Sequence, residues 1–477
     1  MSVVKSSLSV EQERKLLSLF GHVRLHQLYK ASVHSYIHSA FHNRCDGQGP
    51  TVLVAYNKSG FVFGGYISKD YAQTTQAIND DKAFLYSITD QRENPLRVSS
   101  TNGQYGFTDG KYGLNVGVLW FLNNNTATVQ VVAGNSYAFE GEEMHGNDLQ
   151  LTECEVYRVE DCGGRLKTPW RKIDWEGYST KDRLMDYIKN YKPEVKSVVQ
   201  ARVLLVGPVG AGKSSFFNSI NSVFKGHVTG QANTGSAGTS LTTQFRTYSI
   251  KAEQGGKALP LVLCDTMGLE EGPSAGLDID DINSIMKGHV QDRYQFNPSM
   301  SVQTDGVGFC KSPSLKDTIH CVVYVLDACK VTLLSAKMVD KLAAIRKGIN
   351  KLGKEGSECA RGFTCLCMCV FMCVVSLGVP QLVLLTKVDE ACPLVREDLT
   401  NIYLSHYIER MTREVSVCLG VSQSCVLPVK NYSRELELDI HTDILLLTAV
   451  VQMLRYSNNY FDDIYQAVEQ KSEWLGY

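Results

Sequence analysis

The amino-acid sequence predicts two domains of different fold class. Residues 1–165 are expected to form an α+β domain, and residues 199–477 an α/β domain with a mostly parallel, doubly wound sheet. Two observations lead to this prediction. Short candidate strands separated by turn residues fill the first region, whereas from residue 200 apolar β-branched runs alternate with helical segments. The second pattern is typical of a parallel sheet covered on both faces. The polar residues 166–198 are interpreted as a connector.

The composition is that of a globular protein and excludes several other classes. Hydrophobic residues make up 44% of the 477 residues and charged residues 21%, so disorder over most of the chain is not expected. The net charge of −2 gives no overall basic field, so neither nucleic acid nor a membrane surface is an expected partner. No secretory signal is visible at the start, so the 15 Cys are expected to be reduced thiols in the cytoplasm.

Residues 1–165 are expected to contain two helices and six short strands. The helices are expected over 11–20 and 33–41. The strands are expected over 51–56, 61–66, 83–88, 117–122, 129–132 and 154–159. Lys58, Ser59 and Gly60 form a plausible hairpin turn between the first two strands. Gly64 and Gly65, inside the second strand, are interpreted as allowing close packing rather than as a ligand-binding loop.

The later elements follow the alternation of a parallel sheet. One helix is expected in the connector over 180–191, before Pro193. The strands are expected over 203–206, 259–264, 319–326, 381–385 and 425–429. The other helices are expected over 214–224, 335–352, 397–418 and 440–456.

The sharpest motif is Gly-Pro-Val-Gly-Ala-Gly-Lys-Ser at 207–214, here called the phosphate loop. An apolar strand precedes it and an apolar-periodic helix follows it. The glycines let the backbone curl so that its N–H groups point at phosphate oxygens, and the helix adds its positive dipole end. Lys213 is expected to reach the β- and γ-phosphates, and the Ser214 hydroxyl to bind Mg²⁺. The residues expected to hold the nucleotide phosphates are Gly207, Gly210, Ala211, Gly212, Lys213, Ser214 and Ser215.

A second motif, Asp-Thr-Met-Gly at 265–268, follows the strand expected over 259–264. Asp265 is expected to hold Mg²⁺ through water, and the Gly268 backbone N–H to sense a γ-phosphate. A threonine between the phosphate loop and Asp265 is expected as a further Mg²⁺ ligand. Thr234, Thr239, Thr242 and Thr243 all qualify, with Thr239 or Thr242 preferred and Thr239 named as the ligand.

A third motif, Thr386-Lys387-Val388-Asp389, follows the strand expected over 381–385 and predicts guanine recognition. The Asp389 carboxylate can accept from both the ring N1–H and the exocyclic amine of guanine, donors that adenine does not present together. Lys387 is expected to lie over the base and to brace the phosphate loop. The loop over 429–431 is expected to contact the base, with Lys430 as its site residue. The three motifs in this order predict GTP, rather than ATP, with Mg²⁺ as cofactors.

Hydrolysis is expected to be slow or to depend on a partner. A Ras-like enzyme carries a glutamine directly after the Asp-x-x-Gly motif to orient water, but this chain has Leu269 there. The sequence therefore names no catalytic residue.

These motifs and the run at 170–195 resemble the interferon-induced protein 44 family, including its 44-like branch. The first region resembles a TLDc domain, on residues 40–47, 49–51, 63–66 and 83–87. The resemblance covers nearly the whole chain. It implies a cytoplasmic, interferon-inducible immune protein with an antiviral association and a GTPase-like domain. It also implies a TLDc module that links that domain to an unknown protein partner or to self-association.

The chain departs from this family over 354–378, where 25 residues intervene that include five of the 15 Cys. We interpret them as a retained intron or gene-model error, since codons for their flanking residues can match splice sites. Two alternatives stay open. Cys365, Cys367, Cys369 and Cys373 could bind zinc, although the spacing is unusual for a structural site. The uncharged stretch 365–385 is long enough to span a bilayer, but Gly378 and Pro380 interrupt it.

A non-enzymatic function is the main alternative. The second domain could bind nucleotide statically, or could have lost binding, and serve as an interaction scaffold. The intact Lys213, Ser214, Asp265 and Asp389 favour retained binding, whereas Leu269 and the insertion at 354–378 weaken the case for turnover.

Overall fold

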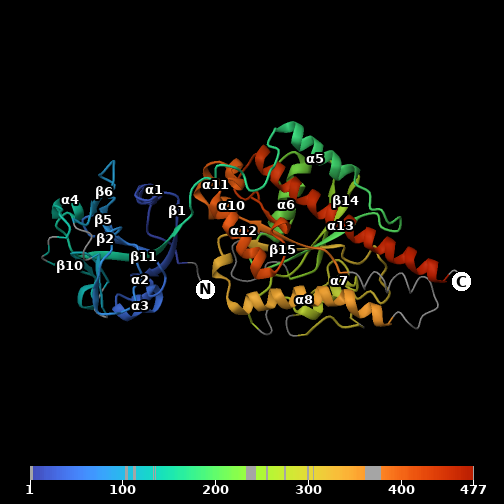
Figure 1. Ribbon diagram of the computed structural model, residues 1–477, viewed down its shortest axis with the longest axis horizontal. Coiled ribbons are helices and arrows are strands. Elements are labelled where there is room, and N and C mark those ends of the chain that lie inside the picture. Colours follow the sequence, from blue (N-terminus) through green and yellow to red (C-terminus); the bar gives the residue numbers. More distant parts are fainter. Residues whose placement is uncertain are drawn as a thin grey trace. The chain divides into compact units, whose positions relative to one another are not determined.

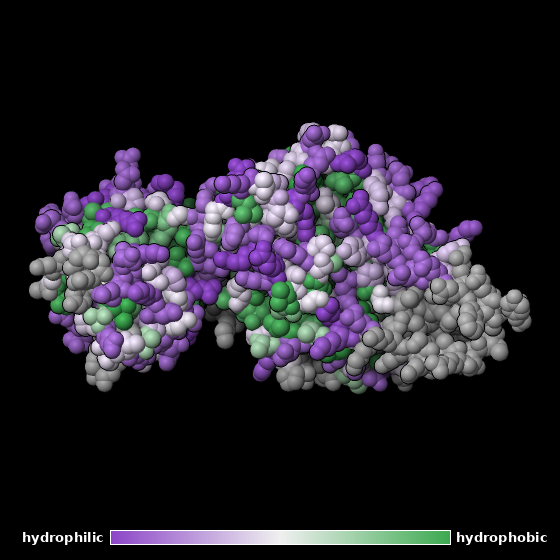
Figure 2. All heavy atoms as spheres, in the orientation of Figure 1, coloured by the Kyte–Doolittle hydropathy of each residue, from purple (hydrophilic) through white to green (hydrophobic). Residues whose placement is uncertain are grey.

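The computed structural model places the chain in two compact units, Met1–Gly164 and Arg165–Tyr477 (Figure 1). It describes residues 4–101, 106–110, 114–132, 134, 136–232, 243–253, 256–272, 276–297, 300–304, 306–359 and 378–475. The residues expected to form a connector, 166–198, fall within the second unit. Hydrophilic side chains cover most of the visible face of both units, while the apolar strand residues lie in their cores (Figure 2).

The first unit is built around a six-stranded antiparallel sheet in the order β1-β11-β2-β3-β5-β6. Its strands are β1 (Val23–Lys30), β2 (Thr51–Asn57), β3 (Val62–Ile67), β5 (Phe84–Ser87), β6 (Leu96–Ser99) and β11 (Leu151–Asp161). Smaller sheets pair β4 (Gln76–Ile78) with β7 (Phe107–Asp109), and β8 (Leu114–Val116) and β10 (Val129–Val131) with β9 (Leu119–Phe121). The helices are α1 (Val10–Ser18), α2 (Ala31–His34), α3 (His38–Cys45) and α4 (Gly141–His145).

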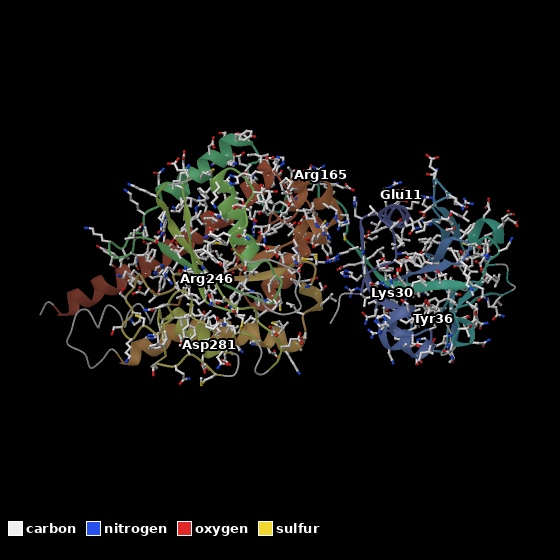
Figure 3. All side chains as sticks on the ribbon, turned by 180° about the vertical axis from the view of Figure 1, so that it is seen from behind. Glu11, Lys30, Tyr36, Arg165, Arg246 and Asp281 are labelled. Atoms are coloured by element: carbon white, nitrogen blue, oxygen red, sulfur yellow. The ribbon has the colours of Figure 1, made fainter. Side chains whose placement is uncertain are left out.

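Local signals in the sequence account for several of these elements. α1 begins with a capping box, in which Ser9 accepts from the Gln12 backbone and the Gln12 side chain accepts from the Ser9 backbone. The expected hairpin at 58–60 is confirmed, because β2 and β3 pair antiparallel on either side of it. Lys30 (labelled in Figure 3) ends β1 and forms an ion pair with the fully buried Glu155 of β11 at 2.9 Å.

Two expected elements of the first unit are wrong. The helix over 33–41 is divided into α2 and α3 at Ser35, whose φ of 82° is incompatible with a helix. The Ser35 carbonyl instead accepts a hydrogen bond from the buried Tyr29 hydroxyl at 2.5 Å. The strand expected over 117–122 begins too early. Gly117 lies in the turn that connects β8 to β9, and β9 begins at Leu119. β1 was not expected, since most of its side chains are only half-buried and its apolar alternation is weak.

The second unit contains a six-stranded sheet in the order β13-β14-β12-β15-β16-β17. All neighbours are parallel except β13, which runs antiparallel to β14. The strands are β12 (Ala201–Val206), β13 (Arg246–Lys251), β14 (Ala258–Asp265), β15 (Cys321–Asp327), β16 (Gln381–Thr386) and β17 (Val426–Pro428). The parallel strands follow the five apolar runs of the sequence. β13 was not expected, because it is a largely polar edge strand.

Helices accompany this sheet, with α6 and α13 on one side and α8 on the other in Figure 1. They are α5 (Tyr178–Asn190), α6 (Lys213–Lys225), α7 (Ile279–Met286), α8 (Ala336–Cys359), α10 (Val388–Ala391), α11 (Pro393–Glu397), α12 (His406–Leu419) and α13 (Ile440–Leu475). The rings of Phe217 on α6 and Tyr248 on β13 stack at 4.1 Å within the core. The core therefore fixes the start of α6, and with it the phosphate loop, against the sheet.

The helix expected over 397–418 is also wrong. The segment forms a 3₁₀ helix over Leu399–Tyr403 and then α12. Two separate caps divide it, since Asp398 accepts from the Thr400 backbone and Ser405 accepts from the Ile408 backbone.

Residues 360–377 of the insertion lie outside the described residues, and so do Cys365, Cys367, Cys369 and Cys373 of the zinc alternative. Among the described residues, no group of three His, Cys, Asp or Glu side chains is arranged to hold a metal ion. None of the described helices has both the length and the apolar composition needed to cross a bilayer.

Gly64 supplies a test of the first unit. A Cβ added there would lie 1.9 Å from the Leu53 carbonyl oxygen on β2 and 2.8 Å from its carbon, so the two strands would have to separate. We expect Gly64→Ala to lower the free energy of unfolding by about 2 kcal/mol or more, measured by urea denaturation. The control is Gly21→Ala, where nothing lies within 4 Å of the added Cβ. Equal stability of the two variants would contradict the packing argument.

Candidate nucleotide-binding site

The phosphate loop joins β12 to α6, and its glycines are required for two different reasons. Gly210 and Gly212 have φ of 74° and 96°, in the left-handed region that favours glycine. No side chain fits at Gly207, because an added Cβ would lie 2.1 Å from the Val325 carbonyl oxygen on β15. Gly212 caps α6, so the first N–H groups of this helix open onto the loop. The local backbone is therefore that of an anion cradle.

Lys213 is a cation buried inside this loop. Its side chain folds back so that Nζ donates to the carbonyl oxygens of Gly207 at 2.9 Å and Pro208 at 3.1 Å. Burial lowers the pKa of Lys213 to about 8, although the nearby Asp265 carboxylate acts in the opposite direction. Since both hydrogen-bond acceptors are neutral, a phosphate oxygen would stabilise the charge better than its present partners do.

Ser214 and Asp265 meet beside Lys213. The Ser214 hydroxyl donates to Asp265 Oδ2 at 2.5 Å. Asp265, at the carboxyl end of β14, is fully buried, and its Oδ1 has no hydrogen-bond partner among the described residues. Burial raises the pKa of Asp265, against the opposing effects of Lys213 and Ser214. A hydroxyl and a carboxylate oxygen are the hard donors that Mg²⁺ prefers, so these residues fit that ion.

The Asp-Thr-Met-Gly segment lies directly against the phosphate loop. Leu269 donates its backbone N–H to Gly207 at 3.0 Å and accepts from Val209 at 3.4 Å, in a short parallel bridge. Gly268 lies so close to Val209 that an added Cβ would be 2.6 Å from its side chain. The Leu269 side chain is buried, so this position offers an apolar group where a Ras-like enzyme orients water.

The motif at 386–389 contacts the phosphate loop at Gly210 and Ala211, away from the contacts of Leu269. The Thr386 hydroxyl donates to the Ala211 carbonyl at 2.6 Å, and Lys387 Nζ donates to the Gly210 carbonyl at 3.1 Å. Lys387 also forms an ion pair with Asp327 at 2.7 Å. Burial alone would lower the pKa of Lys387, but the contact with Asp327 raises it. The expected brace between Lys387 and the loop is thus present.

Asp327 is a site residue that sequence reasoning missed. It ends β15 and lies opposite Thr386 in the parallel register. The sequence contained a signal for Asp327, since an acidic residue at the carboxyl end of an apolar parallel strand lies at the edge of the sheet where ligands bind.

Asp389 and Lys430 come together from α10 and from the loop at 429–439, here called the base loop. Burial raises the pKa of Asp389, and the positive charge of Lys430 opposes this. Lys430 Nζ also pairs with Glu435 at 2.9 Å. The next residue, Asn431, donates from Nδ2 to the Gly212 carbonyl at 3.3 Å, and its Oδ1 is buried with no partner among the described residues. Asn431 therefore presents an unused acceptor beside the phosphate loop.

The fold thus gathers most of the predicted site residues at the carboxyl edge of one sheet. Ser215 lies on α6, where its carbonyl accepts from the Ser219 hydroxyl. Thr234, Thr239 and Thr242 lie outside the described residues. Thr243 is described, and its carbonyl accepts from Phe296 at 3.1 Å. It precedes Arg246 (labelled in Figure 3), which pairs with Asp265 in the antiparallel register.

A family model and a solved structure are similar to parts of this chain. A family model for the TLDc domain matches residues 5–160. A solved structure of Toc33 from Arabidopsis thaliana in complex with GDP and Mg²⁺ aligns with a TM-score of 0.32 and 14% identity, covering 60% of this chain and 94% of that one.

Several relatives match this chain over almost the full length. Interferon-induced protein 44-like from Homo sapiens is 36% identical over 469 residues, which cover 97% of this chain and 96% of the relative. Interferon-induced protein 44 from Homo sapiens is 33% identical over 462 residues, covering 97% and 95%. Its counterpart from Mus musculus is 30% identical over 469 residues, covering 97% and 99%. The chain therefore belongs to the interferon-induced protein 44 family and carries a TLDc domain at its N-terminal end.

Proposed function

We propose that residues 165–477 bind GTP with Mg²⁺ and that the protein acts as a nucleotide-dependent switch in the interferon response. One observation carries the proposal. Asp265 is fully buried beside the Ser214 hydroxyl with one oxygen unpartnered among the described residues, and the buried ammonium of Lys213 lies in the same loop. Burial of these two charges costs stability that their present contacts offset only in part, as the directions of both pKa shifts indicate. A phosphate chain would stabilise the ammonium further, and its metal ion would do the same for the carboxylate.

The phosphate end of the site follows from this arrangement. The loop amides and Lys213 would hold the phosphates, with Ser214 and Asp265 holding Mg²⁺, the latter through water. A threonine from the segment before β13 would complete the set. Thr239 is the candidate from the sequence, and the register of β13 favours Thr243, three residues before the partner of Asp265. Magnesium would neutralise charge on the β- and γ-phosphates when bound.

The part of the site around Asp389 would bind a guanine base. The Asp389 carboxylate would accept from the N1–H and the amino group of the base, while Lys387, braced by Asp327 and Gly210, would lie over the ring. Lys430 and Asn431 would complete the pocket from the base loop. Hydrolysis would be slow or partner-dependent, because the buried Leu269 cannot orient water.

A non-enzymatic scaffold is the second candidate. It is favoured by the bridge from Leu269 to Gly207 and Val209, which already holds the Asp-Thr-Met-Gly segment on the phosphate loop. In either case the TLDc domain would bind a protein partner or a second copy of the chain, and a role in antiviral defence follows from the family. A cytoplasmic location belongs to the same proposal, supported by ten cysteines among the described residues that are free thiols.

Removing Lys213 tests the phosphate site. Lys213→Ala deletes the buried ammonium, so we expect the affinity for a fluorescent GTP analogue with Mg²⁺ to fall by about 100-fold, or about 3 kcal/mol. The measurement is a fluorescence titration of the full chain. The control is Lys225→Ala, at the exposed last residue of the same helix α6. Unchanged affinity in Lys213→Ala would favour the scaffold.

Changing Asp389 tests the choice of base. In Asp389→Asn the side-chain amide can donate to the carbonyl that xanthine has in place of the guanine amine. We expect the ratio of GTP affinity to XTP affinity to fall by at least about tenfold, measured by competition against the same analogue. Glu390→Gln, at the next and exposed position of α10, is the control and should keep the ratio of the unchanged protein. A ratio that does not move in Asp389→Asn would exclude Asp389 from base recognition.

A further inference from the structure

We infer that helix α5 is part of base recognition, and that its Lys181 is a positioning residue that holds the base loop through Asp443 and Tyr432. The inference rests on the proposed binding of GTP and adds a residue far from the three nucleotide motifs. It concerns the segment 165–190, which directly follows the first unit in the chain and lies within the second.

The contact begins with a buried ion pair between two helices. α5 packs along α13, and Lys181 Nζ lies 2.7 Å from Asp443 Oδ2. The Asp443 side chain is 1% exposed and that of Lys181 is 15% exposed. Burial raises the pKa of Asp443, whereas the hydrogen bonds from Lys181 and Tyr432 lower it. Without Lys181, the carboxylate would lose its cationic partner in a buried position.

Asp443 in turn fixes a side chain of the base loop. The Tyr432 hydroxyl lies 2.7 Å from Asp443 Oδ1 and accepts from the Asp439 backbone N–H at 2.8 Å. It also lies 2.9 Å from the Asp439 carbonyl. The hydroxyl has one proton, and an ionised Asp443 is the stronger acceptor for it. The charge on Asp443 therefore decides how Tyr432 closes the loop between 432 and 439.

The same tyrosine connects the loop to the nucleotide site. Its backbone N–H donates to the Ser219 hydroxyl on α6 at 2.9 Å. The two preceding residues are Asn431, bound to the Gly212 carbonyl, and Lys430, whose charge acts on Asp389. A displacement of Tyr432 would move Lys430 and Asn431, which the proposed function places beside the base, while Lys213 and Ser214 would stay on α6.

A second contact reaches the other end of the base loop from the same segment. Arg171 donates to the carbonyls of Val426 and Gln423, each at 2.9 Å, and so holds the start of β17. The Trp175 ring lies 5.5 Å from the His441 ring at the start of α13. Residues 171–181 therefore hold the chain both before and after the base loop. Occupation of the base site should accordingly stabilise the segment that follows the TLDc domain.

The test separates base recognition from general stability. We would measure the affinities of the full chain for a fluorescent GTP analogue and for inorganic tripolyphosphate, both with Mg²⁺. In Lys181→Met and in Asp443→Asn we expect GTP affinity to fall about tenfold and tripolyphosphate affinity to change less than twofold. Lys181→Arg should retain GTP binding. The matched control is Lys189→Met, at an exposed position of the same helix.

Each other outcome overturns the inference. Equal losses for both ligands would show that Lys181 contributes stability alone, and unchanged GTP affinity would show that the loop does not need it. An unchanged protein that binds neither ligand would overturn the proposed function, and the inference with it. If the variants do not fold, amide hydrogen exchange of the unchanged protein, measured with each ligand, tests the role of α5 instead. GTP, but not tripolyphosphate, should slow the amides of 178–190, and equal effects would contradict the role of α5.

Discussion

Three carbonyl groups of the phosphate loop, those of Gly210, Ala211 and Gly212, are held by side chains from other segments, and the rest of the site depends on this constraint. The Gly210 carbonyl accepts from Lys387, that of Ala211 from Thr386 and that of Gly212 from Asn431, whereas those of Gly207 and Pro208 accept from Lys213 inside the loop. Because N–H and C=O point in opposite directions across a planar peptide, these contacts turn loop amides toward the concave side. Residues at the ends of two separate strands, β16 and β17, therefore hold one anion cradle, and these contacts depend on the parallel pairing of the two strands.

Around this loop the fold buries charges that a stable core would avoid. Lys213 and Asp265 are both buried, and their pKa values move in the directions that desolvation imposes. Such groups cost stability and are typical of functional sites. The segment at Gly268 and Leu269 is different, since an apolar side chain is buried and only the backbone meets the loop. Among the described residues, the site thus combines buried charges with a buried apolar side chain at Leu269.

The base loop shows how a site can extend into a segment without any motif. Its contacts run from Asn431 and Tyr432 through Asp443 to Lys181, and from β17 to Arg171. The segment that contributes Arg171 and Lys181 was interpreted from its composition as a connector, but it packs as an integral part of the second unit. A segment that follows one domain in the sequence can therefore also hold a loop of the neighbouring candidate site in place.

By itself, the sequence determined those features whose cause is local. The apolar runs produced all five parallel strands, the glycines at 210 and 212 produced the left-handed loop, and Lys58 to Gly60 produced the hairpin. Tertiary structure decided the features whose cause lies far along the chain. β1 and β13 are edge strands defined by their partners rather than by apolar alternation. Asp327 enters the site because its strand lies beside β16, and Lys181 because α5 packs on α13, some 260 residues later in the chain. Local patterns fix backbone conformation, whereas a contact between distant segments is selected only when the whole core is packed.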